Sequence, residues 1–131
     1  MSLFDEISNT ITIHPQLKER IVELCEFVKR LDETDLAVVD RAYKEVDVDE
    51  WIASAFRAQN FAYSHNLKEN WWKVVKIVRR ELRSEFWFSN LSPIFDSAEC
   101  LLIQPWVGTA FSQKDFNLLT KPLRSVGFQF T

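Results

Sequence analysis

Residues that interrupt helices are scarce in this chain, which has only two glycines and four prolines among 131 residues. None of them lies between residues 16 and 92, and both glycines, Gly108 and Gly127, follow this block. Because glycine and proline break helices, their absence predicts a helical block. Loops that cradle phosphate or hold a nucleophile on a sharp turn need glycine, and the chain has no Walker, G-x-G-x-x-G or G-x-S-x-G motif. These glycine-dependent sites are therefore excluded.

Cysteine, histidine and long apolar runs are also scarce. Cys25 and Cys100 have no C-x-x-C spacing, so we expect thiols rather than a disulfide. The two histidines lack the spacing of metal ligands, and we expect neither a metal nor another cofactor. No run approaches the roughly 18 apolar residues of a membrane span, and the first residues do not resemble a secretory signal. We therefore expect a cytoplasmic protein without membrane contact, folded as one domain over residues 1–131.

Apolar spacing predicts three to four packed helices over residues 15–88. A first long helix starts at Pro15, which suits the first turn of a helix. Its apolar residues fall at spacings of four and three and form one stripe: Leu17, Ile21, Leu24, Val28 and Leu31. Residues 32–35 are predicted to form a turn and a cap before the second helix, and Asp47 and Asp49 are predicted to offer caps for the third.

The third predicted helix, about residues 50–63, has Ile52, Phe56 and Tyr63 on the stripe that we expect to face the core. The stripe of the following helix points about 110° away, too far for one straight helix against one core. We therefore predict a break at residues 64–66. Asn66, with Glu69 three residues later, resembles a capping box at the start of the fourth helix.

The pattern changes after residue 92, so we divide the chain into a helical block and a tail, residues 93–131. Residues 99–104 are short and apolar and end before Pro105, which is typical of a strand. Residues 128–130 alternate apolar and polar side chains like a second strand. Asp96 and Glu99 would then be exposed loop acids, which we favour over the paired carboxylates of a nuclease.

Ser112 and Asp115 predict a capped helix between the two strands of the tail. A strand, a helix and a strand would then follow the helical block of residues 1–92. We therefore predict an α+β fold that is predominantly helical and ends in a small C-terminal strand–helix–strand element.

The two halves of the chain differ in charge. Residues 1–65 carry a net −6 and residues 66–131 a net +3, which gives −3 in total. The positive charge gathers on the fourth predicted helix, where we predict a binding face made of Trp72, Lys73, Lys76, Arg79, Arg80 and Arg83. Within that helix only Lys73 has a well-placed acid, Glu69. A basic stripe with an embedded tryptophan favours a protein partner, and an acidic one in particular.

Other interpretations of this basic face stay open. It could be a solvated surface, or it could pair with the acidic segment of residues 32–50. Nucleic acid is a further alternative, ranked lower because the chain is acidic overall and phosphate binding depends on many basic contacts. A homodimer is the last alternative, with the acidic half of one copy facing the basic half of the other.

His65 is a weak catalytic candidate, together with Arg57 and Glu69. An arginine and a histidine on a helical bundle resemble the HEPN ribonucleases, whose motif is more tightly spaced, so no role is carried over. We rank a small hydrolase or ribonuclease using His65 below a histidine that only occupies a helix junction. The sequence therefore predicts a small protein-binding module, such as an adaptor, an inhibitor or an immunity-type protein, rather than an enzyme.

Overall fold

The computed structural model describes residues 5, 15–81 and 92–130. These residues form six α-helices and a short 3-10 helix, with no β-strand among them. The helices are α2 (Pro15–Lys29), α3 (Glu33–Lys44), α4 (Val48–Ser64), α5 (Lys68–Glu81), α6 (Ser92–Ile103), η2 (Gln104–Trp106) and α7 (Gln113–Ser125). The described chain is therefore all-α, and the predicted α+β class is wrong.

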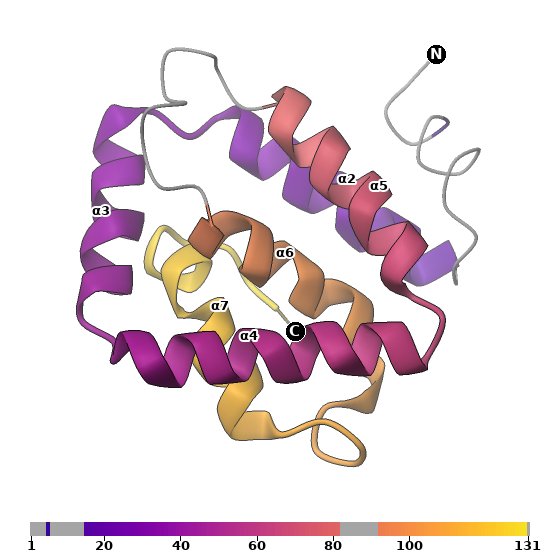
Figure 1. Cartoon of the computed structure of the whole chain (residues 1–131). Coiled ribbons are helices and arrows are strands. Elements are labelled where there is room, and N and C mark those ends of the chain that lie inside the picture. Colours follow the sequence, from indigo (N-terminus) through magenta and orange to yellow (C-terminus); the bar gives the residue numbers. More distant parts are fainter. Residues whose placement is uncertain (1–4, 6–14, 82–91, 131) are drawn as a thin grey trace.

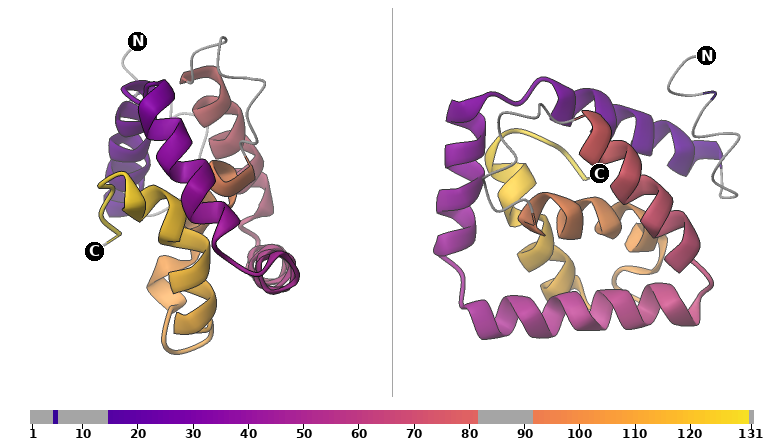
Figure 2. Two further views of the ribbon diagram at one scale, coloured as in Figure 1. Left: turned by 90° about the vertical axis from the view of Figure 1, so that its left-hand side faces the viewer. Right: turned by 45° about the horizontal axis from the view of Figure 1, so that its top comes forward.

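Helix α6 lies at the centre of the molecule. In Figure 1, α2, α3, α4 and α5 outline a frame around it, and Figure 2 shows the same frame from two other directions. Helix α6 contacts each of the other five helices, α7 most extensively. Its residues from Ser97 to Ile103 are at most 2% exposed. A largely apolar helix suits this position, because its second half is shielded from bulk water on every side.

The predicted caps of the second and third helices are confirmed. Asp32 accepts a hydrogen bond from the backbone of Asp35 at 2.9 Å, and the Asp35 carboxylate accepts one from the backbone of Asp32 at 3.1 Å. Asp47 accepts from the backbone N–H groups of Asp49 and Glu50. These bonds satisfy donors that the first turn of a helix otherwise leaves free. The first long helix is confirmed as well, and most of its apolar stripe is buried.

The predicted break after α4 is confirmed, but Asn66 ends one helix rather than starting the next. Its φ of 59° lies in the left-handed region. The backbone N–H of Leu67 donates to the carbonyl of Ala62 at 2.7 Å, and that of Asn66 donates to Tyr63 at 3.3 Å. These two bonds form a Schellman motif, in which asparagine is the common substitute for glycine. The predicted capping box with Glu69 is therefore wrong.

The segment predicted as the first strand is the second half of α6. Pro93 stands in the first turn of this helix, a position that proline tolerates because its missing N–H would have no partner there. A short apolar run cannot be assigned to a strand or a buried helix from periodicity alone. Glu99, predicted in a loop, is consequently 2% exposed inside the bundle.

The second predicted strand is also absent. Phe128 and Phe130 are buried and Gln129 is exposed, so the expected alternation is real, but this segment is not part of a sheet. The ring of Phe128 lies 5.3 Å from that of Phe27 on α2, and the ring of Phe130 lies 5.8 Å from that of Phe116 on α7. Alternating apolar residues here pack an extended tail on helices.

The helix predicted within the tail is confirmed as α7, with Ser112 as its cap. It continues through Pro122 to Ser125. No helix in the described part of the chain is long and apolar enough to cross a membrane.

Candidate functional site

Helix α4 turns large apolar side chains toward solvent. The side chains concerned, which we call the α4 ridge, are Val48, Ile52, Phe56 and Tyr63, between 46% and 69% exposed. They fall within an arc of about 80° on the helix and extend for about 22 Å along it. The prediction that Ile52, Phe56 and Tyr63 face the core is therefore wrong.

The buried side of α4 carries mostly small residues instead. Ser54, Ala58 and Ala62 are each about 1% exposed, and Trp51 is the one large side chain among the buried residues of the helix. Small side chains let the α4 backbone approach α6 and α7 closely. The face of α4 that packs inward is therefore the one with the small residues, and the face with most of its large apolar residues is exposed to solvent.

The described part of the predicted basic face lies on α5, the helix that follows α4. Trp72 is 53% exposed, and its ring meets that of Trp71 edge-on at 5.0 Å. Lys76 is exposed. Lys73 pairs with Glu69 at 3.1 Å, as its spacing indicated. The face is therefore partly neutralised within its own helix.

The remaining cations of the predicted face differ in their surroundings. The guanidinium of Arg79 lies 5.3 Å from the centre of the Phe95 ring, and both Arg79 and Arg80 interact with other groups of the chain. Arg83 lies outside the described residues. A binding role for these six residues stays a prediction.

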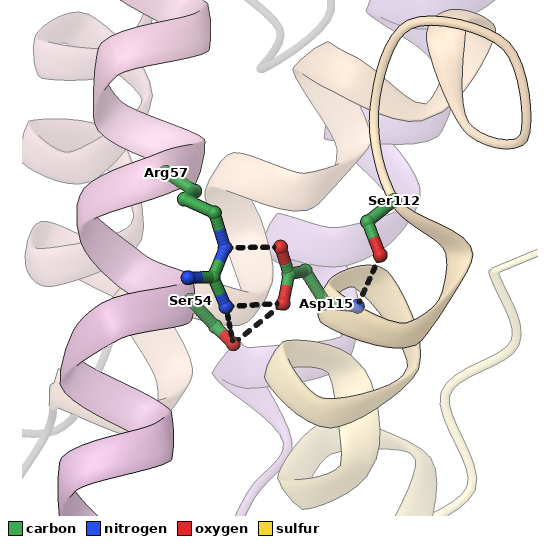
Figure 3. A network of polar contacts seen from close by, with 4 residues as sticks. All are labelled: Ser54, Arg57, Ser112 and Asp115. Atoms are coloured by element: carbon green, nitrogen blue, oxygen red, sulfur yellow. Dashed lines mark hydrogen bonds and ion pairs between the residues drawn. The ribbon is translucent and has the colours of Figure 1, made fainter.

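Arg57, one of the weak catalytic candidates, belongs to a polar network that joins α4 to α7 (Figure 3). Its Nε and one terminal nitrogen donate to the two oxygens of Asp115 at 2.6 and 2.8 Å. Ser54 donates to Asp115 at 2.8 Å, and the Asp115 backbone N–H donates to Ser112 at 3.3 Å. The bond to Arg57 is the main reason why the pKa of Asp115 is lowered. Every member has a partner, so the network is a structural joint between two helices.

His65 and Glu69 lie apart from that network. The His65 ring stacks on Phe61 with 3.9 Å between centres, and its Nδ1 lies 2.9 Å from the Phe61 carbonyl oxygen. His65 and Arg57 are eight residues apart on α4, about 12 Å along the helix axis. Glu69 is occupied by Lys73. The structure thus gives each weak catalytic candidate its own local partner and does not bring the three together.

A cavity of about 360 Å³ opens beside the α4 ridge, between α3, α4, α5 and α6. We call it the aromatic cavity, because it is lined by Tyr43, Trp51, Ile52, Ala55, Phe56, Gln59, Trp71, Phe95 and Asp96. Its volume lies within the range typical of pockets for small ligands. Asp96 is the one carboxylate among the lining residues, and its side chain accepts a hydrogen bond from the indole nitrogen of Trp51 at 2.9 Å.

A second carboxylate lies behind the wall of the aromatic cavity. Glu99 follows Asp96 by three residues, so both project from one side of α6. Burial raises the pKa of Asp96, and burial together with the neighbouring Asp96 raises the pKa of Glu99 to about 8. Trp71 and Lys68 offset only part of that rise. Among the residues that the structure describes, neither carboxylate forms an ion pair.

Other reactive groups give no second candidate site within the described ranges. No cluster of three or more histidine, cysteine, aspartate or glutamate side chains there could hold a metal ion. Cys25 and Cys100 are buried and not joined by a disulfide. Burial raises the pKa of the Cys100 thiol well above its usual value, which keeps this group neutral and unreactive.

Sequence reasoning missed both the α4 ridge and the aromatic cavity. A signal for the carboxylates was present, since Pro93 is typical of a helix start and a spacing of three places Asp96 and Glu99 on one helix face. No protein-family model matches the chain, and comparisons with curated proteins and with solved structures gave no significant match. Function therefore has to be argued from these surfaces.

Proposed function

We propose that this chain is a protein-binding module that contacts its partner through the α4 ridge and through Trp72 with the neighbouring cations of α5. The observation that carries the proposal is the ridge itself, four large apolar side chains within one arc on the outer side of α4, with the polar Gln59 between Phe56 and Tyr63. These side chains are 46% to 69% exposed, and large apolar side chains grouped on one exposed face are the usual mark of an interaction surface. An adaptor, an inhibitor or an immunity-type protein would each use such a surface.

Positive charge at one end of the ridge and on α5 indicates which partner would fit. The Lys68 ammonium lies 5.2 Å from the centre of the Tyr63 ring, at one end of the ridge, and Lys76 is exposed on α5. Apolar side chains with a positive charge at one end complement an amphipathic segment that carries an acidic side chain at the matching end. Phe56, Tyr63 and Trp72 would be the energetic anchors, because large aromatic residues dominate most interfaces.

A paired substitution on the ridge tests the proposal. In Ile52→Ser/Phe56→Ser, two side chains that are 46% and 61% exposed lose their apolar surface, so the fold should persist while partner binding falls at least tenfold. The matched control is Asn60→Ser, an exposed position on α4 outside the ridge. Partners that co-purify with the native chain would be identified, purified and titrated against the three proteins by calorimetry. Equal affinity for the double variant and the native chain would overturn the proposal.

Charge reversal separates this function from its alternatives. Lys76→Glu should weaken binding to an acidic partner, and the loss should shrink at high salt because screening shortens the range of charge interactions. Nucleic-acid binding that is lost in Lys76→Glu and unchanged in Ile52→Ser/Phe56→Ser would overturn the proposal in favour of the nucleic-acid alternative. A mass that doubles at low salt, in the absence of any partner, would overturn it in favour of self-association.

A further inference from the structure

We propose that the aromatic cavity binds a methylated ammonium cation, with Asp96 as its counter-charge. The cavity shares Ile52 and Phe56 with the α4 ridge, whereas its acid, Asp96, belongs to the cavity alone. Its occupation by a small cation requires no protein partner. The two proposals can therefore fail independently.

Aromatic rings form most of the wall of the cavity. Tyr43 and Trp51 meet at 86° with 5.0 Å between ring centres, so their faces point in perpendicular directions. Trp71 and Phe95 supply further ring surface from α5 and α6. The faces of aromatic rings carry partial negative charge and attract cations, and several rings around one small space are the usual recognition device for quaternary ammonium groups.

The carboxylate of Asp96 explains why we expect the cavity to prefer a cation to a neutral apolar ligand. Asp96 has one hydrogen bond to Trp51, and a carboxylate can accept several more. Glu99 stands behind it and adds a second acid to the same side of α6. A partly buried carboxylate that forms no ion pair within the described residues is destabilising, so a cationic ligand would offset part of that cost.

The composition of the wall decides between kinds of cation. A hard divalent metal ion needs several oxygen ligands, and Asp96 is the one carboxylate that lines the cavity. A primary ammonium group needs up to three hydrogen-bond acceptors. A methylated ammonium group instead presents methyl surface to the rings while keeping its charge for Asp96.

The chain already shows that one ring of this wall accepts a cation. The guanidinium of Arg79 lies 5.3 Å from the centre of the Phe95 ring. Arg79 and Lys68 are the cations of α5 placed near the cavity or its acids, and they oppose a second positive charge. We therefore expect modest affinity, set by the balance between these two cations and the two acids.

Choline provides the probe, and its carbon isostere, in which carbon replaces the quaternary nitrogen, provides the matched neutral control. Binding is followed in the full chain by NMR of the five indole N–H groups. Choline should shift the signals of Trp51 and Trp71, which line the cavity, and leave that of Trp106 in place. It should bind about tenfold more tightly than the isostere, because only choline carries the charge that the rings and Asp96 attract.

Two variants complete the test. Asp96→Asn keeps an acceptor for Trp51 and removes the charge, so it should weaken choline about tenfold and leave the isostere unchanged. Glu19→Gln, an exposed position on α2, removes the same charge away from the cavity and should change neither. A trimethyl-lysine peptide, tested beside free choline, tells whether the group is carried by a protein or by a small molecule. Equal binding of choline and isostere, equal binding by Asp96→Asn, or no binding of either cation would overturn the proposal.

The pH supplies an independent readout. Glu99 and Asp96 on α6, Lys68 and Arg79 on α5 and Tyr43 on α3 are the titratable groups placed around the cavity, and α4 contributes the neutral Gln59. Because the pKa of Glu99 is raised to about 8, its negative charge appears mainly above neutral pH. Choline should therefore bind about fivefold more tightly above pH 8, where Glu99 is ionised, than near neutral pH. Glu99→Gln should remove most of this change, and an unchanged pH profile in that variant would contradict the placement of the cation beside α6.

Discussion

The molecule holds buried or partly buried carboxylates in two places, and their surroundings differ. Asp115, between α4 and α7, accepts hydrogen bonds from Ser54 and Arg57, and its pKa is lowered. Asp96 and Glu99, on α6, meet indole rings instead, and their pKa values are raised. The difference separates two uses of a buried acid. Arg57 and Ser54 compensate the charge of Asp115 within the chain, whereas Asp96 is the carboxylate that we propose pairs with a cationic ligand.

The two carboxylate sites also affect the pH dependence of stability in opposite directions. A carboxyl group with a raised pKa in the folded state stabilises the fold while it is protonated and stops doing so as the pH rises. A carboxyl group with a lowered pKa stabilises the fold while it is ionised and stops doing so as the pH falls. Changing one site at a time should therefore produce pH profiles of opposite slope.

The largest effect is expected at Glu99. Its pKa rises from an ordinary 4.5 to about 8, so its contribution is complete below pH 4.5 and is lost as the pH rises through 8. This loss amounts to a few kcal/mol, with about 5 kcal/mol as the upper limit. Urea unfolding at intervals between pH 4 and pH 9 would measure it. Glu99→Gln cannot ionise and should lose much less stability over this range.

The control for this comparison is an exposed glutamate. Glu19→Gln on α2 removes an acid that faces water, so the profile of that variant should follow the native one. A native chain and a Glu99→Gln variant with parallel profiles would show that water or a cation already compensates Glu99, and the contrast with Asp115 would disappear.

A smaller effect of opposite sign is expected at Asp115. Asp115→Asn removes the charge that Arg57 and Ser54 bind, and it should lower the free energy of unfolding by about 2 kcal/mol at neutral pH. The Arg57 side chain is 57% exposed, which keeps this loss below that of a fully buried ion pair. Urea unfolding at neutral pH and below pH 3.8 would measure it.

The pH trend of that loss is the decisive part. The difference between the native chain and Asp115→Asn should shrink as the pH falls through the lowered pKa of Asp115, because the native carboxyl group then becomes neutral too. A difference that stays constant down to acid pH would mean that shape, rather than charge, is what Asp115 contributes.

The parts of the fold that the sequence predicted are those with local causes. Asp32 and Asp47 cap helices through bonds to residues two or three positions away, and the break after α4 depends on neighbours of Asn66. Helix α6 could not be assigned this way. Its apolar run fits a strand as well as a buried helix, and only its packing against five other helices decides between them.

The candidate sites were hidden for a related reason. The rule that large apolar residues face inward placed Ile52 and Phe56 in the core, whereas Ser54 and Ala58 are the residues that pack there. The side chains that line the aromatic cavity come from four helices, and no local pattern brings them together. Places where a sequence departs from the simplest inward–outward pattern are where function is expected.

The smallest predicted effect is the change in the pKa of Asp115 when Arg57 or Ser54 is replaced. Arg57 is the main cause of the lowered pKa of Asp115, and Ser54 contributes less. Arg57→Gln should therefore return the pKa of Asp115 most of the way to 3.8, and Ser54→Ala should raise it by a smaller amount. Carbon-13 NMR of the carboxyl group, followed through an acid titration, would measure both. The Asp96 signal serves as the internal control, because no contact links Asp96 to Ser54 or Arg57 in the described residues.

A larger shift from Ser54→Ala than from Arg57→Gln would mean that the buried hydroxyl, and not the exposed guanidinium, compensates Asp115. The contrast between the two carboxylate sites would then be one of hydrogen bonding rather than of charge.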